Sequence, residues 1–241
     1  MLVLLATIGT IGFNWMSAFG HINGVTPAVI SAKYPTVVTP AGYAFTIWSL
    51  IYVGLIAFSI YQALPAQIDR FRPVRSIYIV SCVLNCVWIY FWHAEAIVVC
   101  FIVICLLWIT LLLMESKLAR FRSLGETWIA RAPFGIYFGW VDAALAVNFA
   151  VMLVYLGKMP EGMWAAVLGS SLLGLSAITA VIIRILFRDF FFPLAVAWAA
   201  TAIAVKNSSE TAIVVTAAVV VVICLVSTGS MVTTLKDSTS E

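Results

Sequence analysis

Residues 132–156 read APFGIYFGWVDAALAVNFAVMLVYL, an apolar run that contains a single charged residue, Asp142. Such a run approaches the roughly 20 residues that an α-helix needs to cross the hydrocarbon core of a bilayer. Seven further apolar runs lie along the chain, and together the eight cover residues 2–20, 41–63, 76–93, 95–115, 132–156, 162–183, 190–206 and 211–235. They predict an all-α, polytopic membrane helix bundle with about eight transmembrane helices.

The charged residues gather in the gaps between these runs, and the basic ones sort by side. If successive gaps face opposite sides of a membrane, one side holds Lys33, Lys158 and Lys206. The side with both termini holds ten basic residues, namely Arg70, Arg72, Arg75, Lys117, Arg120, Arg122, Arg131, Arg184, Arg188 and Lys236. Because cytoplasmic loops of membrane proteins are enriched in Lys and Arg, we expect both termini in the cytoplasm.

The composition fits a multipass integral membrane protein. Hydrophobic residues make up 64% of the chain and charged residues 10%, and the mean hydropathy is +1.12. This leaves too little polar surface to cover a soluble globule. No basic run with interleaved aromatic residues lies outside the apolar runs, so we expect no nucleic-acid partner. The net charge of +3 is instead a sign of how the chain is oriented in the membrane. The lipid bilayer is the expected partner.

The chain shows no pattern typical of an ordinary enzyme. It has no phosphate-binding loop, nucleophile elbow, zinc-ligand spacing or paired carboxylates, so we predict no catalytic residue and no metal site. Cys82 and Cys86 share a helix face, but small buried thiols are the preferred interpretation over a metal pair. His93, beside Glu95 in a short turn, could ligate haem iron; a solvated turn histidine is the preferred interpretation.

Four polar residues fall at membrane depth, where such groups usually face protein or a cavity. They are Asn14, Asn85, Asp142 and Asn148. Helical rise places Trp48 about 10 Å, and Asn85 and Asn148 about 12 Å, below the outer ends of their runs. The shared depth predicts that these side chains gather in the outer half of the membrane.

Aromatic residues accompany this group at helical spacing. Tyr52 lies one turn below Trp48, and Trp88 lies close to Asn85. In the run 132–156, helical spacing forms one stripe of Tyr137, Trp140, Ala144 and Asn148. Indole faces, phenols and carboxamides suit a flat, largely apolar ligand with a few polar edges. The alternative is that the asparagines only join helices, a contribution of about 1 kcal/mol each.

The connection 20–40 is long for a loop, and it carries Pro27, Pro35 and Pro40 with Lys33 as its one charge. We expect a structureless segment that covers something or lies on the membrane interface. The gap from His93 to Glu95 is short, which predicts a tight antiparallel hairpin there. Basic turns are expected at Asp69–Arg75 and Lys117–Arg131.

Three motifs in order resemble the TspO/translocator-protein family, the tryptophan-rich sensory proteins. They are Phe45-Thr-Ile-Trp48-Ser-Leu-Ile-Tyr52 followed by Ala57, Leu84-Asn85-Cys86-Val87-Trp88, and Tyr137-x-x-Trp140 with Ala144 and Asn148. The stretches Thr39-Pro-Ala-Gly-Tyr-Ala-Phe45, Tyr61-Gln-Ala-Leu-Pro65 and Ala204-Val-Lys206 resemble a longer bacterial branch with extra C-terminal helices. The resemblance implies a location in a bacterial cytoplasmic membrane.

It also implies a TspO-like five-helix bundle over 1–156, followed by a C-terminal three-helix transmembrane extension over 157–241. Such bundles are often dimeric and hold porphyrin or haem-type tetrapyrroles, or sterol-like lipids, in a cavity beneath the first loop, in a sensory or regulatory role. Trp48, Asn85 and Trp140 match the family's pocket positions. The full predicted ligand-binding set is Trp48, Tyr52, Asn85, Trp88, Tyr137, Trp140, Ala144 and Asn148. A porphyrin, haem or other tetrapyrrole is the ligand that the resemblance suggests.

This sequence departs from the family at two places. The loop signature survives only as Lys33, Pro35 and Pro40, and no Trp lies between Trp15 and Trp48, which argues against light-dependent porphyrin breakdown. Asp142 stands where the family usually carries a small hydroxyl residue. Helical spacing places it on one face with Gly135, Gly139 and Ala146.

That small-residue face permits close helix contact, with either the 157–241 region or a second subunit. Two alternatives to ligand sensing remain open. One is a proton-coupled transporter or carrier that uses Asp142. The other is a structural subunit of a larger membrane complex, with its contact on the face formed by Ala195, Ala199 and Ala202.

Overall fold

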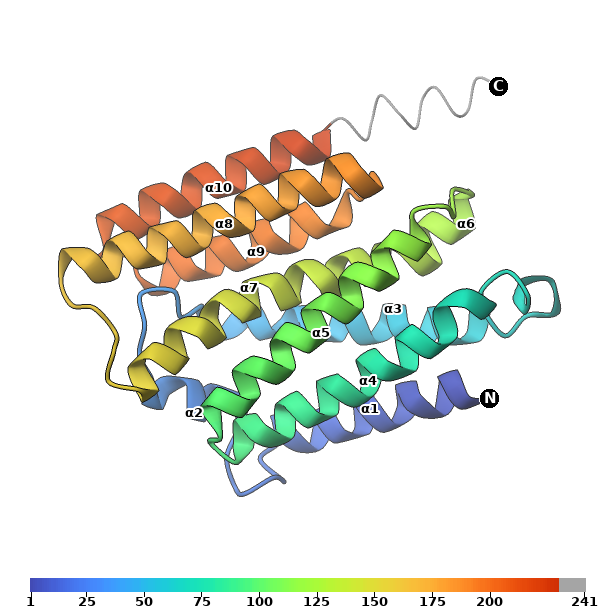
Figure 1. Ribbon diagram of the computed structural model, residues 1–241, viewed down its shortest axis with the longest axis horizontal. Coiled ribbons are helices and arrows are strands. Elements are labelled where there is room, and N and C mark those ends of the chain that lie inside the picture. The colour runs from blue at the N-terminus through green and yellow to red at the C-terminus, as the bar shows by residue number, and fades with distance from the viewer. Residues whose placement is uncertain (230–241) are drawn as a thin grey trace.

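The computed structural model is an all-α helix bundle whose described residues are 1–229 (Figure 1). The predicted fold class is confirmed. Lys236 and the end of the run predicted over 211–235 lie outside the described residues. The long helices are α1 Leu2–Ala18, α3 Ile47–Tyr61, α4 Arg72–His93, α5 Ile97–Leu118, α7 Ala132–Tyr155, α8 Met163–Phe187, α9 Phe191–Lys206 and α10 Thr211–Gly229.

These helices correspond in order to the eight predicted runs. Six helical segments of the described chain are long and apolar enough to cross a membrane: Gly42–Tyr61, Arg72–His93, Ile97–Leu118, Leu124–Tyr155, Met163–Phe187 and Thr211–Gly229. The other two, α1 and α9, are apolar but have 17 and 16 residues. The start of α1 and the end of α10 lie at the same end of the bundle, as an even number of spans requires (Figure 1).

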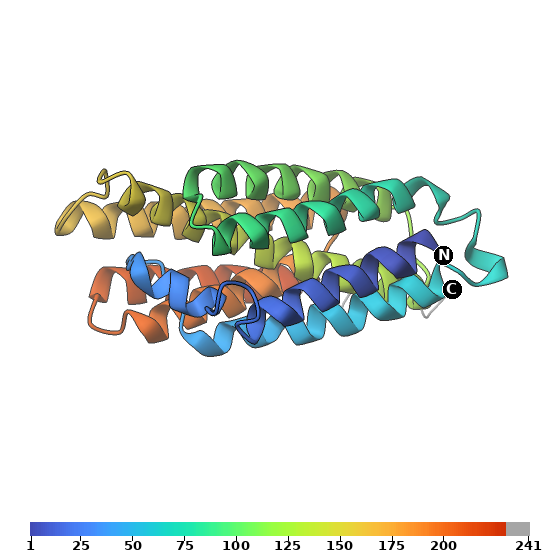
Figure 2. The ribbon, with the colours of Figure 1, turned by 90° about the horizontal axis from the view of Figure 1, so that it is seen from below.

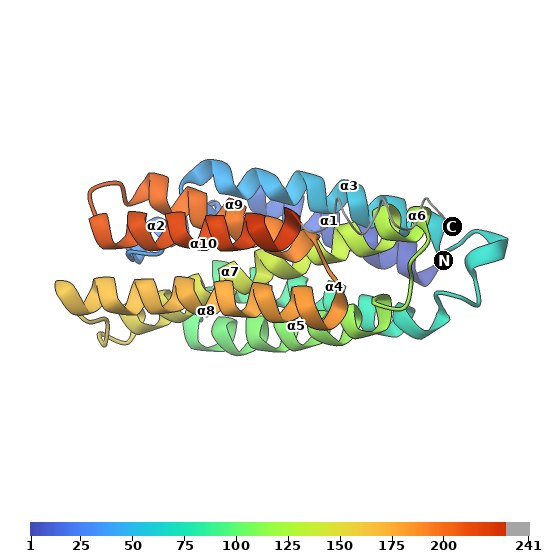
Figure 3. The same ribbon diagram turned by 90° about the horizontal axis from the view of Figure 1, so that it is seen from above.

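The helices form two layers around one central helix. In Figure 2 and Figure 3, α4, α5 and α8 lie on one side, α1, α3, α9 and α10 on the other, and α7 runs between them. Among the candidate spans, the α7 segment has the largest buried share. Helix α9 packs along both α7 and α10. The C-terminal helices are therefore built into the bundle and do not form a separate body beside it.

The connection 20–40 differs from the expectation of a structureless loop, because it contains the short helix α2, Pro27–Lys33. Thr26 caps its N-terminus by accepting a hydrogen bond from the Val29 amide at 3.4 Å, and Pro27 occupies the first turn, where a missing N–H costs nothing. After it, the 3-10 turn η1 (Gly42–Thr46) leads directly into α3.

The basic turn predicted at Lys117–Arg131 is wrong in extent. Helix α5 continues to Leu118, and helical structure resumes at Leu124 with the short α6 (Leu124–Glu126). Ser123 and Glu126 form a capping box at that start, with the Ser123 hydroxyl accepting from the Glu126 amide at 3.3 Å. A π-helical turn, η3 (Thr127–Arg131), then leads into α7. Turn η2 (Pro65–Gln67) lies between α3 and α4.

The hairpin between α4 and α5 is as short as predicted. Glu95 has a φ of 51°, a left-handed conformation that reverses the chain within Ala94–Ala96. This turn lies at the same end of the bundle as α2 (Figure 1).

Candidate functional site

A narrow cavity lies beneath α2, at the end of the bundle opposite the termini. We call it the Trp140 cavity. Its volume is about 50 Å³, and it is lined by Pro27, Ser31, Pro40, Phe45, Trp48, Trp88, Trp92, Trp140, Ala143, Ala144, Val147, Asn148, Ala199 and Ile203. Helices α2, α3, α4, α7 and α9 all contribute to it.

A larger space, the Trp15 cavity, lies beside it between α1 and α3. Its volume is about 410 Å³, within the range of small-molecule sites. It is lined by Ile11, Asn14, Trp15, Ser17, Ala18, Phe19, Thr26, Pro27, Ala28, Gly42, Phe45, Trp48, Ser49, Tyr52, Trp88 and Ile89. Pro27, Phe45, Trp48 and Trp88 line both cavities, so these side chains form the partition between them.

Aromatic contacts hold this partition in place. The Trp48 ring stacks on Tyr52 at a centroid distance of 5.4 Å and meets Trp140 edge-on at 6.4 Å. Phe45 also meets Trp140 edge-on, at 5.9 Å. Tilted and edge-to-face pairs of this kind add about 0.5–1.5 kcal/mol each beyond burial. The cluster joins α3 and α7, which lie far apart in the sequence.

The three asparagines predicted at membrane depth form hydrogen bonds between helices. Asn14 donates to Asn85 Oδ1 at 2.7 Å, which joins α1 to α4. The Trp88 indole N–H donates to Asn148 Oδ1 at 3.2 Å, which joins α4 to α7. Within the described residues, the Asn85 amide nitrogen has no hydrogen-bond partner. The asparagines thus connect helices at the depth of the cavities.

The predicted site residues divide into two groups. Trp48, Trp88, Trp140, Ala144 and Asn148 line the Trp140 cavity, and Tyr52 lines the Trp15 cavity. Asn85 and Tyr137 are buried and line neither. Sequence reasoning missed the walls from α1 and α2 and missed Trp92, although Trp92 follows Trp88 by one helical turn and so shares its face.

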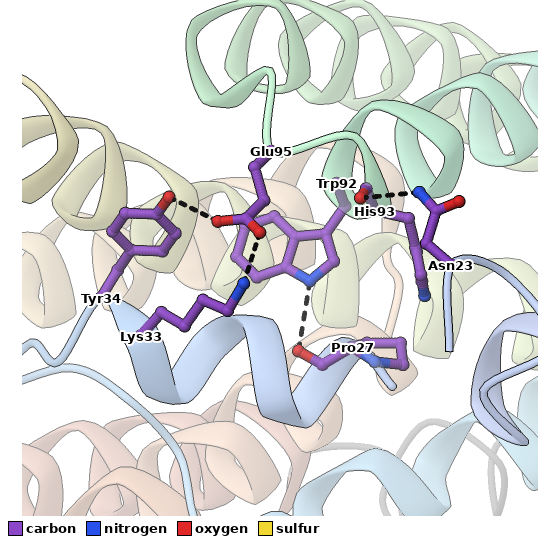
Figure 4. Close-up of polar contacts among 7 residues, drawn as sticks. All are labelled: Asn23, Pro27, Lys33, Tyr34, Trp92, His93 and Glu95. Atoms are coloured by element: carbon purple, nitrogen blue, oxygen red, sulfur yellow. Dashed lines mark hydrogen bonds and ion pairs between the residues drawn. The ribbon is translucent and has the colours of Figure 1, made fainter. Parts of the chain in front are cut away.

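Helix α2 is fastened over the Trp140 cavity by contacts with the turn between α4 and α5 (Figure 4). Lys33 forms an ion pair with Glu95 at 2.5 Å, and the Tyr34 hydroxyl donates to the same carboxylate at 2.9 Å. The Trp92 indole donates to the Pro27 carbonyl at 3.2 Å. The hydrogen bonds from Lys33 and Tyr34 hold the pKa of Glu95 below its usual value. Burial, and then the contact with Glu95, raises the pKa of Tyr34 to about 12.

The preferred interpretation of His93 as a solvated turn residue is wrong. The side chain is 4% exposed, and its Nδ1 lies 2.9 Å from the Ile89 carbonyl oxygen. Because a carbonyl only accepts, Nδ1 carries the proton and Nε2 accepts from the Ser17 hydroxyl at 3.3 Å. Both ring nitrogens are engaged, so His93 stabilises the end of α4 and presents no nitrogen to a ligand.

Helix α9 closes the site from the other side. Its Ala199 and Ile203 line the Trp140 cavity. The Trp198 indole donates to the Ala44 carbonyl at 3.0 Å, and the Ala202 carbonyl accepts from the Ala41 amide at 3.0 Å. The face of Ala195, Ala199 and Ala202, proposed above as a contact with another subunit, is buried inside the chain, so that expectation is wrong.

The small-residue face of α7 meets this same helix. A Cβ on Gly139 would lie 2.4 Å from the Phe192 carbonyl oxygen, and one on Gly135 would lie 2.5 Å from Asp189 Oδ2. Asp142 accepts from the Trp108 indole at 2.9 Å and lines a groove with Ser176 of α8. In the described part of the chain, no Lys, Arg or His pairs with Asp142.

Comparison with known proteins agrees with this architecture. A family model described as TSPO-like protein matches residues 1–230. No curated protein and no solved structure matches the chain. Since the matched region covers nearly all of the sequence and the fold is a bundle of apolar helices, the chain belongs to the TSPO-like protein family of membrane proteins.

Proposed function

We propose that this protein binds a flat, largely apolar molecule, of the tetrapyrrole (porphyrin or haem) or sterol-like class, beneath α2. Occupancy of the site would serve a sensory or regulatory role. The observation that carries the proposal is the pair of adjoining cavities, of about 50 and 410 Å³, which share the side chains of Pro27, Phe45, Trp48 and Trp88 in their linings.

The lining supports binding by ring stacking. Indoles from α1, α3, α4 and α7 supply broad apolar faces. Their polar neighbours are few and uncharged, such as Asn14, Ser49 and Asn148, and these could meet the polar edge of a ligand. Neither lining includes His, Cys or Met. The Tyr52 phenol is the remaining side chain of a type that ligates haem iron, so ring stacking should supply most of the binding and a metal-free porphyrin should bind too.

The experiment is a titration of the purified protein with metal-free protoporphyrin, followed by the shift of its Soret band and by quenching of tryptophan fluorescence. Trp48→Ala should weaken binding by about 1–3 kcal/mol, the scale of one large buried side chain, or about 5- to 150-fold. The matched control is Trp164→Ala on α8, because Trp164 is 65% exposed and lines neither cavity.

A sterol-like ligand is distinguished by competition. If a sterol displaces the porphyrin and Trp48→Ala weakens both, one apolar site serves both classes. The proposal fails if neither class binds saturably, or if Trp164→Ala weakens binding as much as Trp48→Ala does.

A further inference from the structure

Three ionisable side chains are buried together at the end of the bundle that holds the termini, away from both cavities. Glu115 in the last turn of α5 is 1% exposed, Arg131 at the end of η3 is 6% exposed, and Asp189 between α8 and α9 is 0% exposed. They lie where the first seven helices meet the C-terminal ones. Charged groups are seldom buried unless their charges and hydrogen bonds are compensated.

Part of this cluster has clear partners. Asp189 Oδ1 caps α9 by accepting from the Phe191 and Phe192 amides at 2.6 and 2.7 Å. The Arg131 guanidinium donates to the Phe187 and Arg188 carbonyls, both at 2.8 Å. These contacts tie η3 and α9 to the connection between α8 and α9.

The other polar side-chain atoms of this cluster that are fully buried have no hydrogen-bond partner in the described residues. Both Glu115 carboxyl oxygens, Asp189 Oδ2 and Arg131 Nε lack a hydrogen-bond partner within the described residues. Over residues 1–229, ion pairs within 4.0 Å are formed by Lys33 with Glu95 and by Arg70 with Glu126, and by neither Glu115 nor Asp189. Two buried carboxyl groups are therefore left without a direct cation.

The two carboxyl groups lie within hydrogen-bonding reach of each other. If both were ionised, each would be only an acceptor, and two like charges would face each other in a buried place. One proton removes the conflict, because the protonated group becomes a donor to the other. The shared proton thus gives a partner to Asp189 Oδ2 and to one of the two Glu115 oxygens.

We propose that Glu115 and Asp189 together bind one proton, forming a proton-binding site between α5, α7 and the start of α9. Gly135 leaves the room for it, since a Cβ there would lie 2.5 and 2.7 Å from the two Asp189 oxygens. The shared hydrogen bond joins the end of α5 to the connection between α8 and α9.

The charged groups that face the site favour a proton over a metal cation. Arg131 from η3 acts electrostatically on both carboxyl groups, and Arg184 from α8 acts on Asp189, whereas Arg188 from the connection acts on Arg184. Arg184 also lies over the Phe190 ring, 4.1 Å from its centroid. These guanidinium groups compensate the one carboxylate that stays ionised and repel a further cation. The proton satisfies the second carboxyl without adding a charge to the enclosed volume.

Infrared spectroscopy of the purified protein tests the proposal. A protonated carboxyl group absorbs at its own C=O stretching frequency and shifts in D₂O. The measurement is made in the Asp142→Asn background, because Asp142 is a buried carboxyl group outside the proposed site. Glu115→Gln and Asp189→Asn should each abolish the band, and the amide N–H should replace the shared proton so that the fold is kept.

The matched control is Glu126→Gln. Glu126 is also buried, at 2% exposed, but it has Arg70 and the Ser123 amide as partners, so it is ionised and its replacement should leave the band unchanged. The proposal is overturned if the band survives in Glu115→Gln, or if it appears only when Na⁺ and K⁺ are removed, which would indicate a metal cation. If Asp189→Asn fails to fold, the Glu115→Gln result decides.

Discussion

At the scale of single residues, two glycines of α7, Gly135 and Gly139, allow this helix to approach the start of α9 closely. A Cβ on Gly139 would lie 2.4 Å from a backbone oxygen and 2.9 Å from the Ala195 Cβ. Backbone atoms cannot rotate away, so the helices themselves would have to separate. The sequence predicted this close contact from the Gly135 and Gly139 spacing but left its partner open between the C-terminal helices and a second subunit.

Gly139→Ala should therefore destabilise the protein by about 1–3 kcal/mol, the usual cost of overpacking, and Gly139→Leu by more. The control is Gly174→Ala in α8, where a Cβ would meet nothing within 4 Å. That change should be neutral or slightly stabilising, because Ala favours helix by about 1 kcal/mol over Gly. Thermal denaturation in detergent measures both. Equal stability of the Gly139 and Gly174 variants would contradict the packing described here.

Asp142→Asn should be mild, within about 1 kcal/mol, because an amide oxygen can still accept from the Trp108 indole. Porphyrin affinity should not change, since Asp142 lines neither the Trp140 nor the Trp15 cavity. Loss of ligand binding in this variant, with Trp140→Ala unaffected, would mean that the functional face of α7 has been assigned the wrong way round. The carrier hypothesis would then be preferred.

Sequence patterns located the aromatic cluster well and the buried charges poorly. Trp48, Trp88 and Trp140 share a depth on three different helices, and the resemblance to the family adds Trp48 and Trp140 as pocket positions, so depth and motif together indicated the cluster. Glu115 sits beside Ser116 and Lys117, and Asp189 beside Arg188. Charged residues at helix ends normally face water, and nothing local to either position indicates that the π-turn η3 and the α8–α9 connection bury them.

At the scale of elements, α2 is held over the Trp140 cavity by few contacts. Seven residues long, it relies on Lys33, Tyr34 and the Trp92 indole for its position. An isolated helix of this length is not stable in water. Its start could have been predicted from Thr26 and Pro27, which are typical of a helix N-terminus, whereas its contact with Glu95 depends on tertiary structure.

Glu95→Gln should loosen α2, because the amide cannot form the ion pair with Lys33. Acid should do the same in the unmodified protein. A carboxyl pKa lowered in the folded state stabilises above the unfolded pKa, so the contact is complete at neutral pH. It is lost as the pH falls through the lowered pKa, below the ordinary Glu range of about 4.3.

Hydrogen exchange of the amides in 26–34 measures this opening, and the rate should rise several-fold. Glu161→Gln, an exposed acid in the connection between α7 and α8, is the control that should leave exchange unchanged. Unchanged exchange in Glu95→Gln would show that Trp92 and apolar packing hold α2 without the ion pair.

At the scale of the whole molecule, the positive charges and the alternating helices predict one orientation in the membrane. The connections at one end carry Arg70, Arg72, Arg120, Arg122 and Arg188, and those at the α2 end carry Lys33, Lys158 and Lys206. Six segments of the described chain are long enough to span a membrane, and the number of long helices was predictable because each apolar run is read locally. The order in which helices pack was not, since it depends on contacts between distant segments such as α7 and α9.

Both termini should be cytoplasmic. A reporter that is active only in the cytoplasm should give signal when fused after Glu241. The matched fusion in the α7–α8 connection, after Lys158, should be silent. Signal from the Lys158 fusion with silence after Glu241 would reverse the orientation.

The place of α9 also has a consequence for how the molecule is made. Membrane proteins are synthesised from the N-terminus, so α1 to α8 leave the ribosome before α9 exists. Yet α9 lies against the glycine face of α7 and supplies Ala199 and Ile203 to the Trp140 cavity. The glycine face of α7 must therefore stay uncovered until the seventh long helix of the chain, α9, arrives. A chain stalled on the ribosome before Phe191 would contain every tryptophan of the aromatic cluster. It would lack Ala199 and Ile203, and the Trp140 cavity would be open on that side.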